Sequence, residues 1–406
     1  MTDRKIYVYC ELDGQDILVG YLWSHIKGRN ETSSFQYADS WLANPKRFSI
    51  DPSLYLTSGT QYSNNPLFGA YTDCAPDRWG RVLMQRFEQA LAKEEKRSPR
   101  TLNEIDYLML VNDDARQGAL RFKDNLEGKF LFPADIKPIP PLIKLPELLS
   151  ASEKITDNKE TTNDLKILLA PGSSLGGARP KASVIDNEGN LCIAKFPKKD
   201  DTGNVVLWEA VALTLAKEAG INTPDWIVKE ISGKHVLIIK RFDRIKNKRI
   251  PFVSAMTMLS ATDGDKNYSY QDIADIIRQN SSAPKDDMEE LWKRIVFSVL
   301  ISNTDDHLRN HGFIRPDNNG WRLSPIYDIN PSIDNIGLLS TMIAQGDFSA
   351  TLENALSVAE YFEISSEKAN KIIEQIKTSV SKWKQVAKRV GLSQTEINKM
   401  EIAFSC

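Results

Sequence analysis

An apolar helix pattern that runs straight into a polar loop is the feature of this sequence that most restricts its fold. Apolar residues in 288–300 recur at helical spacing, which predicts a core helix with a wide apolar face. The chain then enters the segment 302–310 (Ser-Asn-Thr-Asp-Asp-His-Leu-Arg-Asn), which carries Asp305 and Asn310. A second acid, Asp328, follows a predicted hairpin. The sequence therefore places three oxygen-bearing side chains in a fixed order around one buried helix.

The order of these residues indicates a phosphoryl-transfer site. An isolated Asp or Asn in a loop is usually a turn or cap residue. Kinases, however, place a catalytic acid, an Asn five positions later and then a second acid around the phosphates of ATP. The first acts as a base on the acceptor hydroxyl, and the other two bind Mg²⁺, a hard cation. We therefore predict Asp305 as the base and Asn310 and Asp328 as metal ligands.

The histidines of the same loop do not predict a metal site of their own. The chain holds only 4 histidines, and they form no cluster with the spacing of metal ligands. We expect His307 and His311 to make structural hydrogen bonds or to contact the nucleotide, and Asp306 to cap the loop locally.

Composition narrows the class of protein further. The 406 residues are enough for two or three domains, and a net charge of −2 gives no reason to expect nucleic acid or an anionic membrane as a direct partner. A local basic patch stays open, since net charge hides asymmetry. The 4 scattered cysteines predict neither a disulfide framework nor a zinc site. Without a signal-peptide pattern or a membrane-spanning apolar run, we expect a cytoplasmic protein.

The first third of the chain predicts a small domain and a connector. Two strands within 6–23 around the turn Asp13-Gly14, and a helix over 77–92, indicate a small α+β domain in 1–132. Prolines then cluster, and the residues that follow are polar without apolar periodicity. We interpret 133–164 as a connector.

The rest of the chain has the layout of a kinase. The segment 165–244 combines a hairpin, a helix and a second hairpin, which is the layout of a kinase N-lobe, and 245–406 is mainly helical, like a C-lobe. An amphipathic pattern over 372–390 predicts one more helix near the C-terminus. The predicted fold class is α+β: a bilobal, protein-kinase-like fold with a β-rich N-lobe, a helical C-lobe and a small N-terminal α+β domain.

A loop of small residues and a strand lysine precede the catalytic motif. Small residues over 172–181 let backbone N–H groups approach phosphate oxygens, although the loop taken alone is more typical of a flexible turn. Lys195 lies in an apolar strand, where it either reaches out to water or binds the phosphates of ATP. In the second case Glu209, early in the next helix, is its predicted ion-pair partner.

Together these segments resemble the HipA family of toxin serine/threonine kinases over nearly the whole chain. The similarity lies in the segments 75–79 (Ala-Pro-Asp-Arg-Trp), 114–121 (Asp-Ala-Arg-Gln-Gly-Ala-Leu-Arg), 173–181 (Ser-Ser-Leu-Gly-Gly-Ala-Arg-Pro-Lys), 194–197 (Ala-Lys-Phe-Pro), 240–244 (Lys-Arg-Phe-Asp-Arg), 303–313 and 324–328 (Ser-Pro-Ile-Tyr-Asp).

The resemblance implies a nucleotide site with ATP and Mg²⁺ as cofactors. It implies Asp305 as catalytic base, Asn310 and Asp328 on Mg²⁺, and nucleotide contacts from Gly176, Gly177, Ala178, Arg179, Pro180, Lys181, Lys195, Lys240, Arg241, Phe242 and His307. It also implies self-phosphorylation in trans on a serine of the phosphate loop, where Ser174 is the best match and Ser173 the close competitor. A phosphate there would put about two negative charges where the ATP phosphates sit, so it would inactivate the enzyme.

Three functions stay open at this point. The leading one is an ATP- and Mg²⁺-dependent protein kinase that modifies a translation-related protein, such as an aminoacyl-tRNA synthetase, as the toxin of a toxin–antitoxin pair. Its expected partner is a HipB-like helix-turn-helix antitoxin, with DNA contacted only indirectly, no membrane partner, and a homodimer within the antitoxin complex as a further option. The alternatives are a small-molecule phosphotransferase and a catalytically weak co-repressor that binds the antitoxin.

Overall fold

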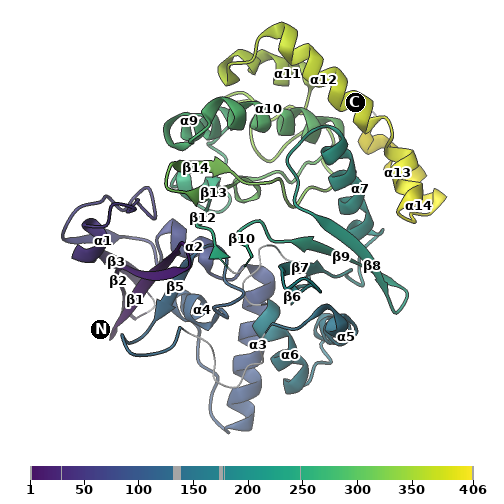
Figure 1. Ribbon diagram of the computed structural model, residues 1–406. Coiled ribbons are helices and arrows are strands. Elements are labelled where there is room, and N and C mark those ends of the chain that lie inside the picture. The colour runs from purple at the N-terminus through teal and green to yellow at the C-terminus, as the bar shows by residue number, and fades with distance from the viewer. Residues whose placement is uncertain are drawn as a thin grey trace. The chain divides into compact units, whose positions relative to one another are not determined.

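The computed structural model describes residues 2–28, 30–130, 139–172, 177, 179–246 and 248–404 (Figure 1). Internal contacts divide the chain into two compact units. The first unit comprises Met1–Asp200 and Glu230–Val253, and the second comprises Asp201–Lys229 and Ser254–Cys406. The domain boundaries drawn from the sequence at 132, 164 and 244 stay a prediction.

The first unit begins with a five-stranded antiparallel sheet in the order β4-β3-β2-β1-β5. The predicted hairpin at Asp13-Gly14 joins β1 to β2, and both residues have positive φ, as a tight hairpin turn requires. One face of the sheet is buried through residues such as Val8, Leu22 and Phe35, while the alternate residues face outward. Its strands are β1 (Thr2–Leu12), β2 (Gln15–Lys27), β3 (Asn30–Tyr37), β4 (Thr60–Ser63) and β5 (Leu120–Lys123).

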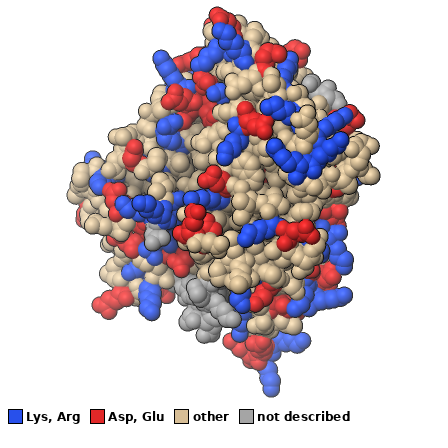
Figure 2. All heavy atoms as spheres, turned by 45° about the vertical axis from the view of Figure 1, so that its right-hand side comes forward, with Lys and Arg blue, Asp and Glu red and all other residues tan. Residues whose placement is uncertain are grey.

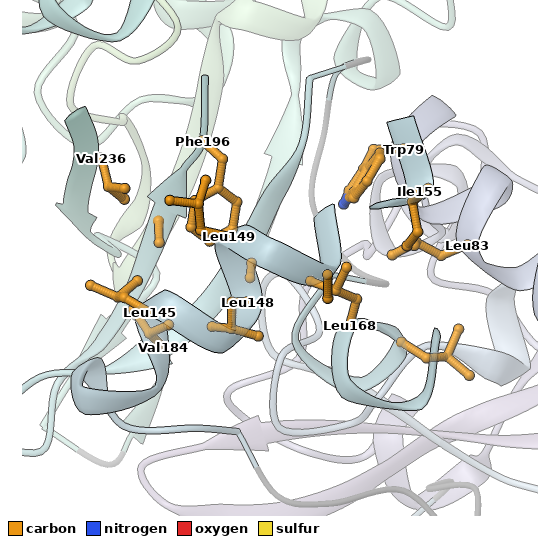
Figure 3. Packing of buried hydrophobic residues seen from close by; sticks show 14 of the residues in the cluster. Trp79, Leu83, Leu145, Leu148, Leu149, Ile155, Leu168, Val184, Phe196 and Val236 are labelled. Atoms are coloured by element: carbon orange, nitrogen blue, oxygen red, sulfur yellow. The ribbon is translucent and has the colours of Figure 1, made fainter. Parts of the chain in front are cut away.

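A second sheet of the first unit packs with the helices α3, α4, α5 and α6 around one hydrophobic core. Strands β6 (Lys181–Ile185) and β7 (Leu191–Lys195) pair antiparallel, as the first predicted hairpin requires, and β7 also pairs antiparallel with β9 (Lys234–Lys240). Figure 3 shows Leu148 and Leu168 between the strand residue Val184 and the helix residue Leu83. The helices of this unit are α1 (Asp39–Leu42), α2 (Gly69–Cys74), α3 (Arg78–Glu94), α4 (Glu104–Leu110), η1 (Leu142–Lys144), α5 (Leu145–Thr156) and α6 (Thr162–Gly172).

The prediction that prolines break regular structure in 133–164 was wrong at Pro146, while the assignment of this segment as a connector stays a prediction. The helix α5 spans Leu145–Thr156 and buries Leu145, Leu148, Leu149 and Ile155 in the core. Pro146 lies in the first turn of α5, where the missing N–H costs nothing, so this proline begins a helix instead of breaking one. Residues 133–138 lie outside the described part of the chain.

The second unit is mainly helical and is built around α10 (Pro284–Leu300). The predicted core helix is confirmed: Leu291, Trp292 and Ile295 are fully buried. Ser269 caps α9 as predicted, in a reciprocal bond with Asp272. The other elements are α7 (Val205–Glu218), α8 (Ala255–Met258), α9 (Tyr270–Asn280), η2 (Leu308–Asn310), β13 (Gly312–Asp317), β14 (Gly320–Leu323), α11 (Leu352–Ser357), η3 (Ala359–Phe362), α12 (Ser366–Val380), α13 (Trp383–Arg389), α14 (Gln394–Met400) and η4 (Glu401–Phe404).

The amphipathic segment near the C-terminus differs from its prediction in one respect. The single helix expected over 372–390 is two helices, because α12 ends at Val380 and α13 begins at Trp383. At the junction the Lys382 N–H donates to the Ser379 carbonyl at 3.1 Å, three residues back instead of four. The apolar stripe continues across this tightened turn, so periodicity alone did not reveal the break.

Four short strands complete the list of elements. Strands β10 (Arg244–Ile245) and β11 (Lys248–Arg249) pair with each other in the first unit. Strands β8 (Trp226–Ile231) and β12 (Phe252–Ser254) contain two of the three points where the chain passes from one unit to the other. No helix in the described part of the chain has the length and apolarity that a bilayer crossing needs. On the face shown in Figure 2, basic and acidic side chains are interspersed.

Candidate active site

The catalytic loop of the second unit begins where α10 ends. Ser302 has φ 51°, and the Asn303 N–H donates to the Ser298 carbonyl at 2.9 Å while the Ser302 N–H donates to Val299 at 3.3 Å. This pair of bonds is a Schellman motif, which terminates a helix by turning one residue into the left-handed region. The motif has serine where glycine is usual. It fixes the direction in which the chain leaves the core and enters the loop.

The structure brings the Asp305, Asn310 and Asp328 segments together within the second unit. Asn310 is buried, and its Nδ2 donates to the Asp305 carbonyl at 3.1 Å. The Tyr327 hydroxyl donates to the Arg309 carbonyl at 2.6 Å, which ties the residue before Asp328 to the residue before Asn310. These bonds stabilise the loop 302–310 and join it to the segment that carries Asp328, which lies 23 positions after Asp305.

The surroundings of Asp305 change its acidity. Partial desolvation of the Asp305 carboxylate raises its pKa, and the negative charges of Asp328 and Asp306 raise it further against the opposing effect of His307. Asp328 therefore lies close enough to act on Asp305 electrostatically. Asp328 also has φ 56°, a left-handed conformation that is uncommon outside glycine and that recurs at functional sites.

Asp306 is an anchor of this loop, and its prediction as a local cap was wrong. It is buried, and it accepts hydrogen bonds from the Tyr270 hydroxyl on α9 and from Ser298 on α10 at 3.2 Å. His311 Nε2 lies 3.1 Å from its other oxygen. Burial alone would raise the pKa of Asp306, but His311, the Tyr270 hydroxyl and His307 outweigh burial and lower it. The residue beside the predicted base is thus held ionised and fixed to two helices.

The donor set fits Mg²⁺. The amide of Asn310 gives its N–H to Asp305, which fixes the amide plane and leaves its oxygen for a ligand. Mg²⁺ in nucleotide sites is usually held by one or two side-chain oxygens, with phosphate oxygens and water completing the octahedron, so Asn310 and Asp328 suffice. The described residues contain no group of three or more His, Cys, Asp or Glu side chains placed to hold a metal. A site made by one Asn, one Asp and a nucleotide would not form such a group.

In the first unit, the start of α3 holds the end of the predicted phosphate loop. The Gly177 N–H donates to the Asp77 carboxylate, and the Trp79 N–H donates to the Gly177 carbonyl at 3.3 Å. The Trp79 indole N–H donates to the Lys181 carbonyl at 3.0 Å. Gly177 has φ 86°, so a side chain here would be strained, and a Cβ atom would lie 2.8 Å from Lys181 Nζ. The loop therefore requires glycine at this position.

Two lysines lie opposite each other next to this loop. Lys181 on β6 pairs directly with Lys195 on β7, which concentrates two positive charges at one end of the hairpin. The arrangement fits the predicted phosphate contacts of both lysines. Pro180 lies beside them, and its carbonyl accepts from the Phe196 N–H at 3.0 Å.

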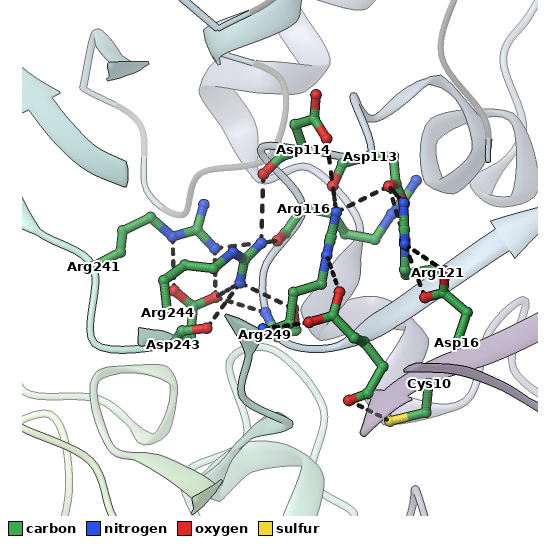
Figure 4. Close-up of polar contacts among 12 residues, drawn as sticks. Cys10, Asp16, Asp113, Asp114, Arg116, Arg121, Arg241, Asp243, Arg244 and Arg249 are labelled. Atoms are coloured by element: carbon green, nitrogen blue, oxygen red, sulfur yellow. Dashed lines mark hydrogen bonds and ion pairs between the residues drawn. The ribbon is translucent and has the colours of Figure 1, made fainter. Parts of the chain in front are cut away.

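The predicted hinge carries a buried ionic network (Figure 4). Arg241 is buried and donates from Nε to Asp243 at 2.8 Å and from its other nitrogens to the carbonyls of Ala115 and Arg116. Asp243 also accepts from the Gly118 N–H at 2.7 Å and from Arg244 at 2.9 Å. The side chain of Arg241 is thus committed to protein groups. Its backbone N–H donates to the Leu191 carbonyl at 3.0 Å, so a nucleotide contact would have to come from its backbone carbonyl.

Replacing Asp243 should destabilise the first unit. Burial alone would raise the Asp243 pKa, but Arg241 and Arg244 outweigh burial and hold the pKa well below its ordinary value. Asp243→Asn leaves two guanidinium groups without their counter-charge, which should lower the free energy of unfolding by about 3 kcal/mol in urea denaturation at neutral pH. Asp39→Asn, at an exposed carboxylate, is the matched control and should change the free energy of unfolding little.

The pH dependence of the stability difference between wild type and Asp243→Asn follows from the lowered pKa of Asp243. A lowered folded-state pKa contributes stability that is present above the unfolded-state value of about 4 and is lost as the pH falls below it. The gap between wild type and Asp243→Asn should therefore narrow in acid. Equal urea midpoints for Asp243→Asn and Asp39→Asn at neutral pH would show that the network contributes nothing.

Several predicted residues stay predictions. Gly176, Ala178, Ser173 and Ser174 lie outside the described residues. Arg179, Lys240 and Phe242 are partly buried, and their contacts with nucleotide are untested. His307 is partly buried and lies near enough to Asp305 to lower its pKa. Glu209 is buried on α7, where an ionised carboxylate requires a partner; its pairing with Lys195 is also untested.

Sequence reasoning missed the residues that hold the site in place. Asp77 and Trp79 bind the phosphate loop, and the only sequence signal was an Asp at a helix start. Arg294 is fully buried on α10 and donates to the Ser324 carbonyl at 2.7 Å, which fixes the strand that leads to Asp328. A charged residue inside the apolar pattern of 288–300 was the available signal for Arg294.

A known family model covers both the predicted phosphate loop and the catalytic loop. The family model described as "HipA-like C-terminal domain" matches residues 173–383, which is more than half of the chain. A Haemophilus influenzae protein named "Putative kinase" is 27% identical over 237 residues, which cover 49% of this chain and 68% of that protein. The serine/threonine-protein kinase CtkA of Helicobacter pylori is 25% identical over 179 residues, covering 41% of this chain and 55% of CtkA. The chain thus spans only about half of CtkA.

A solved structure shares the fold over the full chain. It is HipA of the Shewanella oneidensis toxin–antitoxin system, determined as a complex with HipB and its operator DNA. The TM-score is 0.69 at 17% identity, and the match covers 98% of this chain and 95% of that one. This match confirms the predicted α+β, protein-kinase-like fold class, and the relatives' names support a kinase of HipA type. The chain belongs to the family of proteins that carry a HipA-like C-terminal domain.

Proposed function

We propose that the chain is an ATP- and Mg²⁺-dependent protein kinase that phosphorylates serine or threonine. The observation that carries the proposal is the convergence in the second unit: Asn310 bonds to the backbone of Asp305, and the charge of Asp328 raises the Asp305 pKa. A base with a raised pKa beside an oxygen ligand set is what phosphoryl transfer to a hydroxyl requires. The kinase names of the relatives support the same activity.

Each residue then has a role in this reaction. Lys181 and Lys195 bind the phosphates of ATP, and Asp77 and Trp79 hold Gly177 in place beside Lys181. Asn310 and Asp328 hold Mg²⁺, which neutralises charge on the phosphates when it is bound. Asp305 orients the acceptor hydroxyl and takes its proton. Asp306, fixed to α9 and α10, keeps the base in position and adds negative charge that strengthens it.

The biological role follows from the relatives and is also a proposal. HipA of Shewanella oneidensis is part of a toxin–antitoxin system and was solved with HipB and operator DNA. We extend this to a toxin that phosphorylates a translation-related protein and is bound by a HipB-like helix-turn-helix antitoxin. DNA contact through the antitoxin, a homodimer in that complex and a cytoplasmic location belong to the same proposal.

Self-phosphorylation offers the test of the activity. Wild type incubated with Mg²⁺ and ATP should gain one phosphate on Ser174, which peptide mass spectrometry locates. Ser174→Ala should abolish the modification, while Ser173→Ala, the neighbouring matched variant, should keep it. A Ser174→Ala protein that gained phosphate on Ser173 would move the assignment by one residue. A wild type that labels only a small alcohol and never a protein would instead be a small-molecule phosphotransferase.

A further inference from the structure

The outward face of the N-terminal sheet is both aromatic and cationic. Strand alternation buries Ile6, Val8 and Leu22 on the opposite face and turns their neighbours outward. We call this outward surface the aromatic face. Its members are Lys5, Tyr7, Tyr9, Tyr21, Trp23, Tyr62, Arg121, Lys123 and Phe130.

Strand register arranges the aromatic face in rows across the sheet. One row runs from Tyr62 on β4 through Ser34 and Trp23 to Lys5 on β1. The next row runs through Thr60, Gln36, Tyr21, Tyr7 and Lys123, one from each strand. Neither row contains an acidic residue. Neighbouring strands lie about 4.8 Å apart, so each row is a flat strip long enough for several planar groups.

The rings and cations of the aromatic face contact one another. Lys5 Nζ lies 4.3 Å from the Tyr21 ring centroid, and that ring lies 5.7 Å from the Tyr7 ring. Lys123 Nζ lies 4.5 Å from the Phe130 ring. Tyr7, Tyr21 and Trp23 thus form one group of rings under Lys5, and Tyr9 and Phe130 form a second group under Lys123. Tyr62 at one end is 79% exposed, so this surface is open to solvent there.

The two lysines of the aromatic face lack an acidic partner in the described part of the chain. Arg121 pairs with Asp16 at 2.8 Å and with Asp113, and His25 pairs with Asp3 at 3.0 Å. Lys5 and Lys123, by contrast, contact only aromatic rings through their amines among the described residues. A partner with negative charge and flat apolar groups would complement both features of the surface.

We propose that the aromatic face binds single-stranded nucleic acid. Bases stack on Tyr7, Tyr21 and Trp23, and the amines of Lys5 and Lys123 move from the rings to phosphate oxygens. An antiparallel sheet that presents aromatic rings with flanking cations is a known solution for binding unpaired bases. A protein partner is less well matched, because protein interfaces exclude lysine from their centres. The binding does not require phosphoryl transfer, so it is separable from the proposed kinase activity.

Fluorescence anisotropy with labelled 12-nucleotide U-only RNA and T-only DNA tests this proposal. At low salt wild type should bind both, and affinity should fall as salt rises, because phosphate contacts release counterions. Lys5→Glu with Lys123→Glu should weaken binding at least ~10-fold, since two phosphate contacts become repulsive. The matched control, Lys388→Glu with Lys399→Glu, makes the same charge change at exposed lysines of α13 and α14 and should bind like wild type. Asp305→Asn should also bind like wild type.

A second measurement on the unmodified protein keeps the test independent of folding. Ultraviolet crosslinking of 4-thiouridine RNA should label peptides that contain Tyr7, Tyr21 or Trp23. Crosslinks confined to other peptides, or equal affinity in both double variants, would overturn the proposal. So would binding of a 12-residue glutamate peptide in place of the oligonucleotides, which would assign the face to an acidic protein.

Discussion

Asp305→Asn is expected to fold like wild type and to lose phosphoryl transfer by at least ~10³-fold. The substitution keeps the size of the side chain and removes both the base and the charge near the acceptor hydroxyl. Folding should be unaffected because the residue is exposed and the loop is held by other groups, namely Asp306 and the backbone bond from Asn310. Initial rates of label transfer from [γ-³²P]ATP, with circular dichroism as the folding check, measure this effect.

The pH profile gives an independent check on the same base. Asp305 must be ionised to accept a proton, and its pKa is raised in the folded protein. Activity should therefore be full above the raised pKa and fall as the pH drops through it, at a higher pH than an ordinary aspartate near 4 would give. Asp334→Asn, an exposed carboxylate in a neighbouring loop, should keep the wild-type rate and profile. If Asp305→Asn transferred phosphate at the wild-type rate, Asp305 would not be the catalytic base.

Asp328→Asn is expected to weaken Mg²⁺ binding, so that more Mg²⁺ is needed, and to lower transfer at least ~10²-fold. Asparagine tolerates the left-handed backbone at this position, so the substitution removes a carboxylate ligand without straining the loop. The change also removes a negative charge that raises the Asp305 pKa. The acid limb of the residual activity should therefore move to lower pH, a shift that loss of a metal ligand alone would not produce.

A Mg²⁺ titration of ATP binding and turnover measures the Asp328 effect. Wild type should require less Mg²⁺ for half-maximal activity than Asp328→Asn does. An identical Mg²⁺ dependence in the two proteins would exclude Asp328 as a ligand. An unchanged acid limb with a large loss of activity would show that Asp328 acts on the metal without acting on Asp305.

Local patterns predicted much of the fold. The apolar spacing of 288–300 indicated the buried α10, and Ser269 indicated the start of α9. Both features depend only on residues that are close together in the sequence. Asp305, Asn310 and Asp328 lie within a short stretch of sequence, so their order alone predicted that they lie near one another. The helix α5 was missed because proline was taken as a breaker, although at Pro146 it starts a helix.

Long-range bonds were beyond sequence reasoning. The Gly177 N–H binds Asp77, which lies 100 positions earlier, and Arg241 binds the Ala115 carbonyl, which lies 126 positions earlier. No periodicity encodes such pairs, and a lone Arg in a predicted hinge is equally compatible with nucleotide binding. The aromatic face was likewise invisible as a unit, because only strand register brings Tyr62, Trp23 and Lys5 into one row.

Transfer of the terminal phosphate of ATP is the most direct test of the account. Purified wild type should move label from [γ-³²P]ATP to a serine or threonine side chain, its own or that of another protein, only when Mg²⁺ is present. Chelation with EDTA and the Asp305→Asn substitution should each abolish the signal. A folded wild type that transfers no label with Mg²⁺ and ATP, or a transfer that survives both treatments, would contradict the assignment of Asp305, Asn310 and Asp328 as a phosphoryl-transfer site.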